Sequence, residues 1–264
     1  MAIRSLVFAA CLIVFLALQP GILVPDEGRA GGRERFVPVL MYHRVDTATS
    51  PGGPGLKVTP GQFARQMDYL ARAGYHPVTL DRAVAYLRRG GALEPRPVVI
   101  TFDDGYEDNY RFAFPVLKKY HFPATIFLVA GAVDKTNYFD RGPVLPMLQW
   151  GQIREMAADG IDFESHGARH LHMAGLAPDQ AVAELLSSRT ILESALGRPV
   201  AFFCYPYGSF DQKTRRLARR YYRGAVSTRP GVNRPGADLY ALRRLRVNGR
   251  IGPADFAALL LGTG

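Results

Sequence analysis

Cysteine is nearly absent from this chain of 264 residues, which contains only Cys11 and Cys204. So few cysteines exclude a disulfide scaffold and any cysteine-rich zinc or iron–sulfur site. Acidic residues are also scarce, 23 against 33 basic ones, which gives a formal net charge of +10. This excess suits an anionic partner, such as nucleic acid, a membrane surface or an acidic polymer, but it carries no information about the fold. A hydrophobic content of 48% excludes a disordered chain.

Long apolar runs are missing as well, except near the N-terminus. Residues 6–18 form a continuous apolar run after a short, positively charged start. Its length is within the range of a signal-peptide core but short for a membrane span. We therefore expect residues 1–24 to be a signal peptide, or an N-terminal membrane anchor with residues 6–24 in the bilayer. Either role predicts an exported protein that is periplasmic, secreted or anchored to the outer face of the inner membrane.

The rest of the chain is expected to be a linker over residues 25–35 and a single domain over residues 36–264. Strand-like and helix-like segments alternate through this domain, with short loops between them. The strands are expected at residues 36–42, 97–102, 124–129, 161–164, 200–205, 224–227 and 242–247. The longest helices are expected at residues 178–196 and 211–222. This order predicts an α/β fold with a mostly parallel sheet, either open or closed as a barrel.

Two adjacent carboxylates, Asp103 and Asp104, follow a strongly apolar strand and precede Gly105. In parallel α/β folds, ligands bind at the carboxyl ends of the strands. Neighbouring residues of an extended chain point to opposite sides. One carboxylate can therefore bind a metal while the other reaches a substrate or a water molecule. Taken alone, the segment is explained equally well by an Asp-Asp-Gly turn that caps a helix.

Histidines gather after another strand, where three of the six in the chain lie within residues 164–172. His166 and His170 have a metal-binding spacing if the segment turns helically, because they then share one face. His172 complicates the choice, and solvated surface histidines are the simpler alternative. The position directly after an apolar strand favours a site. One aspartate and two histidines on a divalent metal leave positions open for water and substrate, as in catalytic centres.

A third segment, residues 203–208, is an apolar strand that ends in Tyr-Pro-Tyr-Gly. It offers aromatic faces for sugar rings and a backbone N–H at Tyr207. An apolar strand that ends in a turn explains it equally well. Cys204 lies in this strand, where a small buried apolar side chain is the expected role.

Together, the Thr-Phe-Asp-Asp-Gly, Ser-His-x-x-x-His and Tyr-Pro-Tyr-Gly segments resemble the polysaccharide deacetylases of the NodB-homology group, carbohydrate esterase family 4. The resemblance covers residues 36–261. Residues 39–45 and 242–247 resemble the Met-Tyr-His branch, which includes poly-N-acetylglucosamine deacetylases. The resemblance implies a distorted (β/α)7 barrel. It also implies a hydrolase that removes N-acetyl groups from an amino-sugar polysaccharide or oligosaccharide: poly-N-acetylglucosamine, peptidoglycan or an exopolysaccharide.

The resemblance also implies roles for individual residues. Asp104, His166 and His170 match the metal ligands, Asp103 the general base, and the Tyr207 N–H the donor to the oxyanion. The cofactor is expected to be one divalent metal, Zn²⁺ in the first place, with Co²⁺, Ni²⁺ or Fe²⁺ as alternatives.

The chain departs from the family pattern in two places. The arginine that usually orients the catalytic aspartate is missing from the third motif, and we expect Arg244 or Arg246 to replace it. The late histidine that serves as general acid is missing too, and we expect His43 to take its role.

Two other functions fit the same segments. One is a hydrolase of C–N bonds in a non-sugar amide, and the other is a carbohydrate-binding protein without activity. The basic helix at residues 211–222 raises nucleic-acid binding as a further alternative. A solvated helix face explains this helix better, with attraction to an anionic envelope surface second. We expect an N-acetylated glycan as the partner, and no nucleic acid.

Overall fold

The computed structural model describes residues 35–139 and 141–262. The predicted signal peptide or anchor, and the linker up to residue 34, lie outside this part, so these assignments stay predictions. Within the described ranges, no helix is both long enough and apolar enough to cross a bilayer.

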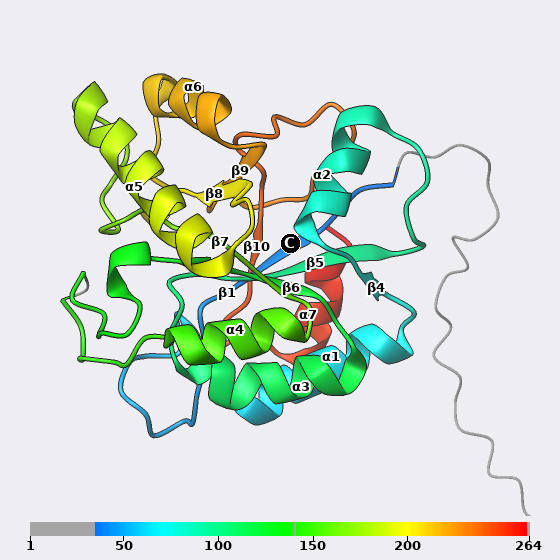
Figure 1. Ribbon diagram of the computed structural model, residues 1–264. Coiled ribbons are helices and arrows are strands. Elements are labelled where there is room, and N and C mark those ends of the chain that lie inside the picture. Colours follow the sequence, from blue (N-terminus) through cyan, green and yellow to red (C-terminus); the bar gives the residue numbers. More distant parts are fainter. Residues whose placement is uncertain (1–34, 140, 263–264) are drawn as a thin grey trace, which may run out of the picture. The chain divides into compact units, whose positions relative to one another are not determined.

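One curled sheet forms the centre of the domain, and all its strand pairs are parallel. The strand order is β10-β1-β5-β6-β7-β8-β9, with β4 paired to β5 beside this path. The strands are β1 (Val39–Tyr42), β4 (His76–Pro77), β5 (Pro97–Phe102), β6 (Ala124–Leu128), β7 (Ile161–Ser165), β8 (Phe202–Cys204), β9 (Gly224–Val226) and β10 (Leu245–Arg246). An isolated parallel bridge joins Val226 of β9 to Leu242, in the segment that leads into β10, and so brings the two ends of the path close together. The sheet is therefore a distorted α/β barrel (Figure 1), as the family resemblance implies.

Helices cover the outside of the sheet in two groups. Figure 1 shows α1, α3 and α4 close together on one side, and α5 and α6 next to each other on the other side. The α-helices are α1 (Pro60–Arg72), α2 (Leu80–Arg89), α3 (Phe114–Tyr120), α4 (Trp150–Ala158), α5 (Pro178–Leu196), α6 (Gln212–Tyr221) and α7 (Pro253–Leu260). Short helical turns are η1 (Asn109–Ala113), η2 (Ala130–Ala132) and η3 (Pro206–Gly208).

Burial and capping explain why these segments fold as they do. All six residues of β5 are buried, since one face of a barrel strand packs in the barrel interior and the other packs under the outer helices. Helix α1 begins at the N-cap Thr59, whose hydroxyl accepts the Gln62 N–H. It buries Phe63, Met67 and Leu70, each of which stabilises the fold by about 1.5–3 kcal/mol.

Several strands are shorter than the sequence predicts. The strand expected at residues 36–42 begins at Val39, because Pro38 has no N–H to donate to a neighbouring strand. The strand expected at residues 242–247 is reduced to β10, because the Asn233 side chain hydrogen-bonds the backbone N–H and C=O of Arg243. The sequence also gave no sign of a small separate sheet, in which β2 (Arg44–Val45) pairs with β3 (Lys57–Val58).

Candidate metal centre and catalytic site

The carboxyl ends of β5, β7 and β8 bring the predicted site residues together. Asp103 and Asp104 follow β5, the two histidines follow β7, and Tyr207 follows β8. Both aspartates and both histidines are buried.

Three side-chain atoms converge at the centre of this group. Asp104 Oδ1 lies 3.2 Å from His170 Nε2 and 3.4 Å from His166 Nε2. The two Nε2 atoms lie 3.2 Å apart. His166 Nδ1 is 2.8 Å from the Cys204 carbonyl, which only accepts hydrogen bonds. Nδ1 therefore carries a proton, and Nε2 is the nitrogen whose lone pair can bind a cation at the centre when the ring is neutral.

The electrostatics of this group favour a cation between the three atoms. Burial lowers the pKa of His166, but Cys204 and the contact with Asp104 raise it well above its ordinary value. Burial raises the pKa of Asp104, but the contacts with His166 and His170 hold it well below its ordinary value. The site therefore attracts positive charge, and a carboxylate with two imidazole nitrogens fits a divalent metal ion.

A loop, rather than a helical turn, brings the two histidines together. The segment after β7 has no helical residues, so the helical spacing expected from the sequence is wrong. Gly167 and His170 instead adopt left-handed conformations, with φ of 81° and 61°. These two positions fold the chain back so that both rings face Asp104.

Asp103 forms a buried ion pair with Arg244. Nη1 and Nη2 of Arg244 lie 2.6 Å from Oδ1 and Oδ2 of Asp103. Burial raises the pKa of Asp103, but Arg244 outweighs this effect and keeps it below its ordinary value. Of the two arginines that the sequence proposed for this contact, Arg244 makes it, whereas Arg246 is exposed on β10.

Cys204 does more than fill space in the core. Its Sγ lies 3.1 Å from Arg244 Nη2, and it stands with Asp103 and His166 in a second group that could hold a metal. Burial raises the pKa of its thiol. In the sequence, Cys204 could be noticed because it lies in the third motif, where the family usually has arginine. In this chain Arg244 provides the guanidinium instead, and it packs against the small side chain of Cys204.

His43 lies near Asp103, and Tyr207 packs against His170. His43 Nε2 is 3.9 Å from Asp103 Oδ2, and burial lowers the pKa of His43. The Tyr207 ring packs 4.4 Å from the His170 ring, measured between centroids, and stacks on His172 at 4.1 Å. Tyr207 is 46% exposed, so this aromatic side of the site is open to solvent. Sequence reasoning missed Phe139, whose ring lies 4.5 Å from His170.

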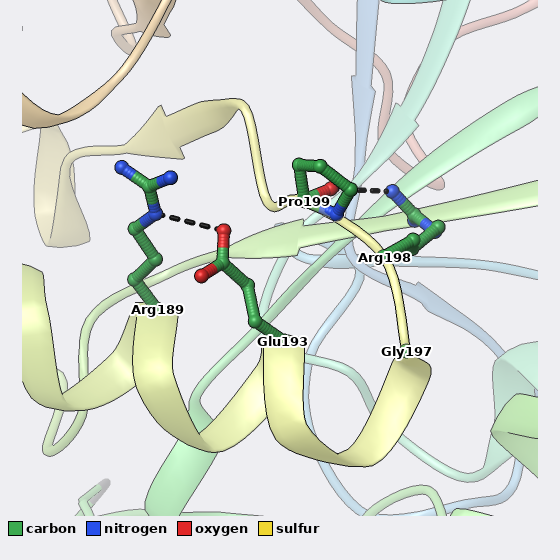
Figure 2. A pocket seen from close by; sticks show the side chains of 5 residues that line it. All are labelled: Arg189, Glu193, Gly197, Arg198 and Pro199. Carbon is green, nitrogen blue, oxygen red and sulfur yellow. Dashed lines mark hydrogen bonds and ion pairs between the residues drawn. The ribbon is translucent and has the colours of Figure 1, made fainter.

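A surface hollow elsewhere on the domain does not belong to the site. Figure 2 shows it at the C-terminal end of α5, where the chain leads into the start of β8. The predicted site residues follow the other ends of the strands. The charges of the hollow are already paired, with Arg189 Nε 2.8 Å from Glu193 and Arg198 Nη2 2.5 Å from Asp162.

Comparison with known proteins gives a consistent result. The profile of the polysaccharide deacetylase family matches residues 90–223. The Bacillus subtilis protein YxkH, which carries the name of a polysaccharide deacetylase, is 33% identical over 85% of this chain and 76% of its own length. The poly-beta-1,6-N-acetyl-D-glucosamine N-deacetylase of Staphylococcus epidermidis is 31% identical over 79% of this chain and 78% of its own length.

Solved structures of related proteins have the same fold as this chain. The Streptococcus pyogenes deacetylase PplD, in complex with acetate, matches with a TM-score of 0.78 and 26% identity over 86% of this chain and 99% of its own. IcaB from Ammonifex degensii matches with a TM-score of 0.73 and 30% identity over 86% of this chain and 97% of its own.

Proposed function

The chain belongs to the polysaccharide deacetylase family and is a polysaccharide N-deacetylase; we propose that it needs a divalent metal and that its substrate is a polymer of N-acetylglucosamine. The observation that carries the metal proposal is the convergence of Asp104, His166 and His170. Zn²⁺ suits this donor set, and Co²⁺, Ni²⁺ or Fe²⁺ also fits it. When bound, such an ion lowers the pKa of water and polarises an acetamide carbonyl.

Asp103 is proposed as the general base. Its contact with Arg244 keeps the carboxylate ionised at neutral pH and fixes its orientation. Each carboxylate oxygen has two lone pairs, so one on each oxygen remains to accept the proton of the attacking water. Arg244 acts through Asp103, as a positioning residue.

His43 is proposed as the general acid and Tyr207 as the oxyanion donor. His43 lies beside Asp103, so a substrate bound next to the carboxylate also meets the imidazole, which can protonate the leaving amine. The pKa of His43 is lowered by burial, and this makes the protonated ring a better acid. The backbone N–H of Tyr207 is assigned by resemblance. It is supported by the packing of Tyr207 on His170, one of the proposed metal ligands.

The substrate proposal rests on the relatives and on the open side of the site. The Staphylococcus epidermidis relative is named for poly-beta-1,6-N-acetyl-D-glucosamine. Tyr207 and Tyr138, which are 46% and 52% exposed, offer aromatic surface to the apolar face of a sugar ring. Export through residues 1–24, or anchoring by residues 6–24, stays a prediction.

The test is acetate release from N-acetylglucosamine oligomers by the full chain, with and without a chelator. An Asp104→Ala variant removes one proposed ligand, and Asp179→Ala, an exposed carboxylate in the first turn of α5, is the matched control. We expect release that the chelator and Asp104→Ala abolish and that Asp179→Ala leaves intact. No release from protein that contains metal would favour a non-sugar amide as substrate. No release and no bound metal would favour a carbohydrate-binding role.

A further inference from the structure

The loop that carries the two histidines is held in a conformation that its sequence does not favour. His170 has a positive φ of 61°, and a side chain other than glycine rarely adopts this conformation without support. Its ring must nevertheless face Asp104 from a fixed position. Something outside the proposed ligands therefore holds the loop.

Glu184, on α5, makes the contacts that do so. Its Oε2 accepts the backbone N–H of Ala168 at 3.0 Å and that of Arg169 at 2.9 Å. Its Oε1 accepts Arg169 Nε at 2.7 Å. The side chain is 1% exposed. A buried, charged acceptor of two consecutive backbone N–H groups forms strong hydrogen bonds that fix the backbone between the histidines.

The rest of the loop is held from two further directions. Ala130 and Gly131 of η2 donate their N–H groups to the Gly167 and Ala168 carbonyls, both at 3.0 Å. Ser188 lies one turn after Glu184 on α5, and its hydroxyl is 2.7 Å from that of Ser165, the last residue of β7, whose Oγ accepts the Gly167 N–H of the loop. Glu184 is thus the charged member of a polar stripe on the buried side of α5 that faces the loop.

We propose that Glu184 is a positioning residue for the metal centre, which sets the affinity for the metal by fixing the loop between His166 and His170. This inference rests on the proposed function, in which these histidines hold the ion. Outer partners that orient metal ligands typically change affinity by about 10- to 100-fold when they are lost. The sequence predicts a long helix over residues 178–196 but does not single out this carboxylate.

The experiment titrates Zn²⁺ into the metal-free full chain and its variants by calorimetry. Glu184→Gln keeps the size of the side chain but removes its charge. Glu184→Asp keeps the charge but withdraws it by one methylene. The matched control is Glu193→Gln, because Glu193 lies on the same helix and also accepts a backbone N–H, that of Val200 at 2.9 Å, and an arginine Nε. Figure 2 shows Glu193 near the C-terminal end of α5, in the surface hollow described above.

We expect Glu184→Gln to raise the Kd for Zn²⁺ by about tenfold or more, and Glu193→Gln to leave it unchanged. Excess Zn²⁺ should restore acetate release by Glu184→Gln, because a high concentration of the ion compensates for a raised Kd. In the metal-free protein, the amides of Ala168 and Arg169 should exchange hydrogen faster in Glu184→Gln. If Glu184→Gln does not fold, the same measurements on Glu184→Asp test the role of Glu184.

Two results would overturn the inference alone: wild-type affinity in the Glu184 variant, or an equal loss of affinity in the Glu193 control. A wild-type chain that binds no Zn²⁺ would instead overturn the proposed metal centre, and the role of Glu184 with it.

Discussion

Arg244 carries its charge into the interior of the barrel, where its side chain is fully buried. A guanidinium is stable there only with a partner, and Asp103 provides one through two short contacts. Arg244 Nε also donates to the Ser227 carbonyl at 2.8 Å. The charge that the proposed mechanism places on Asp103 is therefore part of the stability of the fold as well.

Replacing Arg244 should reveal this double role. We expect Arg244→Met to abolish acetate release and to destabilise the fold by about 3–5 kcal/mol, because it leaves the Asp103 carboxylate buried and unpaired. The double variant Asp103→Asn/Arg244→Met should regain much of this stability but no activity. Denaturant unfolding of the three proteins measures the effect, and equal stability of the single and double variants would contradict it.

Gly208 supports the turn that places Tyr207. Its φ is 67°, and a Cβ at this position would lie 1.9 Å from the Thr228 hydroxyl oxygen. We expect Gly208→Ala to shift the turn and to lower acetate release by tenfold or more, on the order of 1.4 kcal/mol in the barrier. Gly175→Ala is the control, since Gly175 has a φ of 79° but nothing within 4 Å of its Cβ position. Equal activity of the two variants would show that steric contact at Gly208 is unimportant.

At the residue scale, the sequence brought Asp103, Asp104, His166 and His170 to attention through short motifs, because catalytic chemistry needs specific residue types at strand ends. It could not reveal Glu184 or the Cys204–Arg244 contact. Both depend on which elements lie side by side in the folded chain, and Glu184 has no local pattern that sets it apart.

Among the elements, α6 is fixed at its start by Asp211, which also reaches beyond the helix. The carboxylate accepts the Thr214 N–H at 2.8 Å, as an N-cap, and the Gly175 N–H at 3.1 Å. Asp211 therefore connects α6 to the segment around Gly175, which follows the loop that carries His166 and His170.

We expect Asp211→Ala to cost about 1 kcal/mol of stability and Asp211→Asn to cost less. The N–H groups of Thr214 and Gly175 lower the pKa of Asp211 from its ordinary value of 3.8. A lowered pKa means that the ionised carboxylate stabilises the fold above pH 3.8, and that this contribution is lost as pH falls through the folded-state pKa. The stability difference between wild type and Asp211→Asn should therefore shrink on acidification. Unfolding between pH 2.5 and 7 in the presence of chelator tests this, and a constant difference would contradict it.

Elements with strong local signals were predictable to the residue. Helix α5 has the predicted bounds, with proline in its first turn and Gly197 as a left-handed C-cap. Strand β5 also has its predicted bounds. The short strands β8 and β10 were predicted too long, because their ends depend on hydrogen bonds to distant segments that no local pattern records.

For the whole molecule, a bound metal should raise the stability of the fold. A ligand that binds only the folded state adds about 2.7 kcal/mol at a concentration 100 times its Kd. We expect Zn²⁺ to raise the melting temperature of the wild-type chain and a chelator to reverse the change. Asp104→Ala should show neither effect in the same scan. A rise of equal size in that variant would point to binding elsewhere.

The contact between Asp103 and Arg244 joins residues 141 positions apart in the chain. Closing so long a loop costs entropy that only the completed tertiary structure recovers. Refolding kinetics should therefore show activity returning later than helix content. A nascent chain cannot complete the proposed site before Arg244 has been synthesised, because Arg244 lies 141 positions after Asp103.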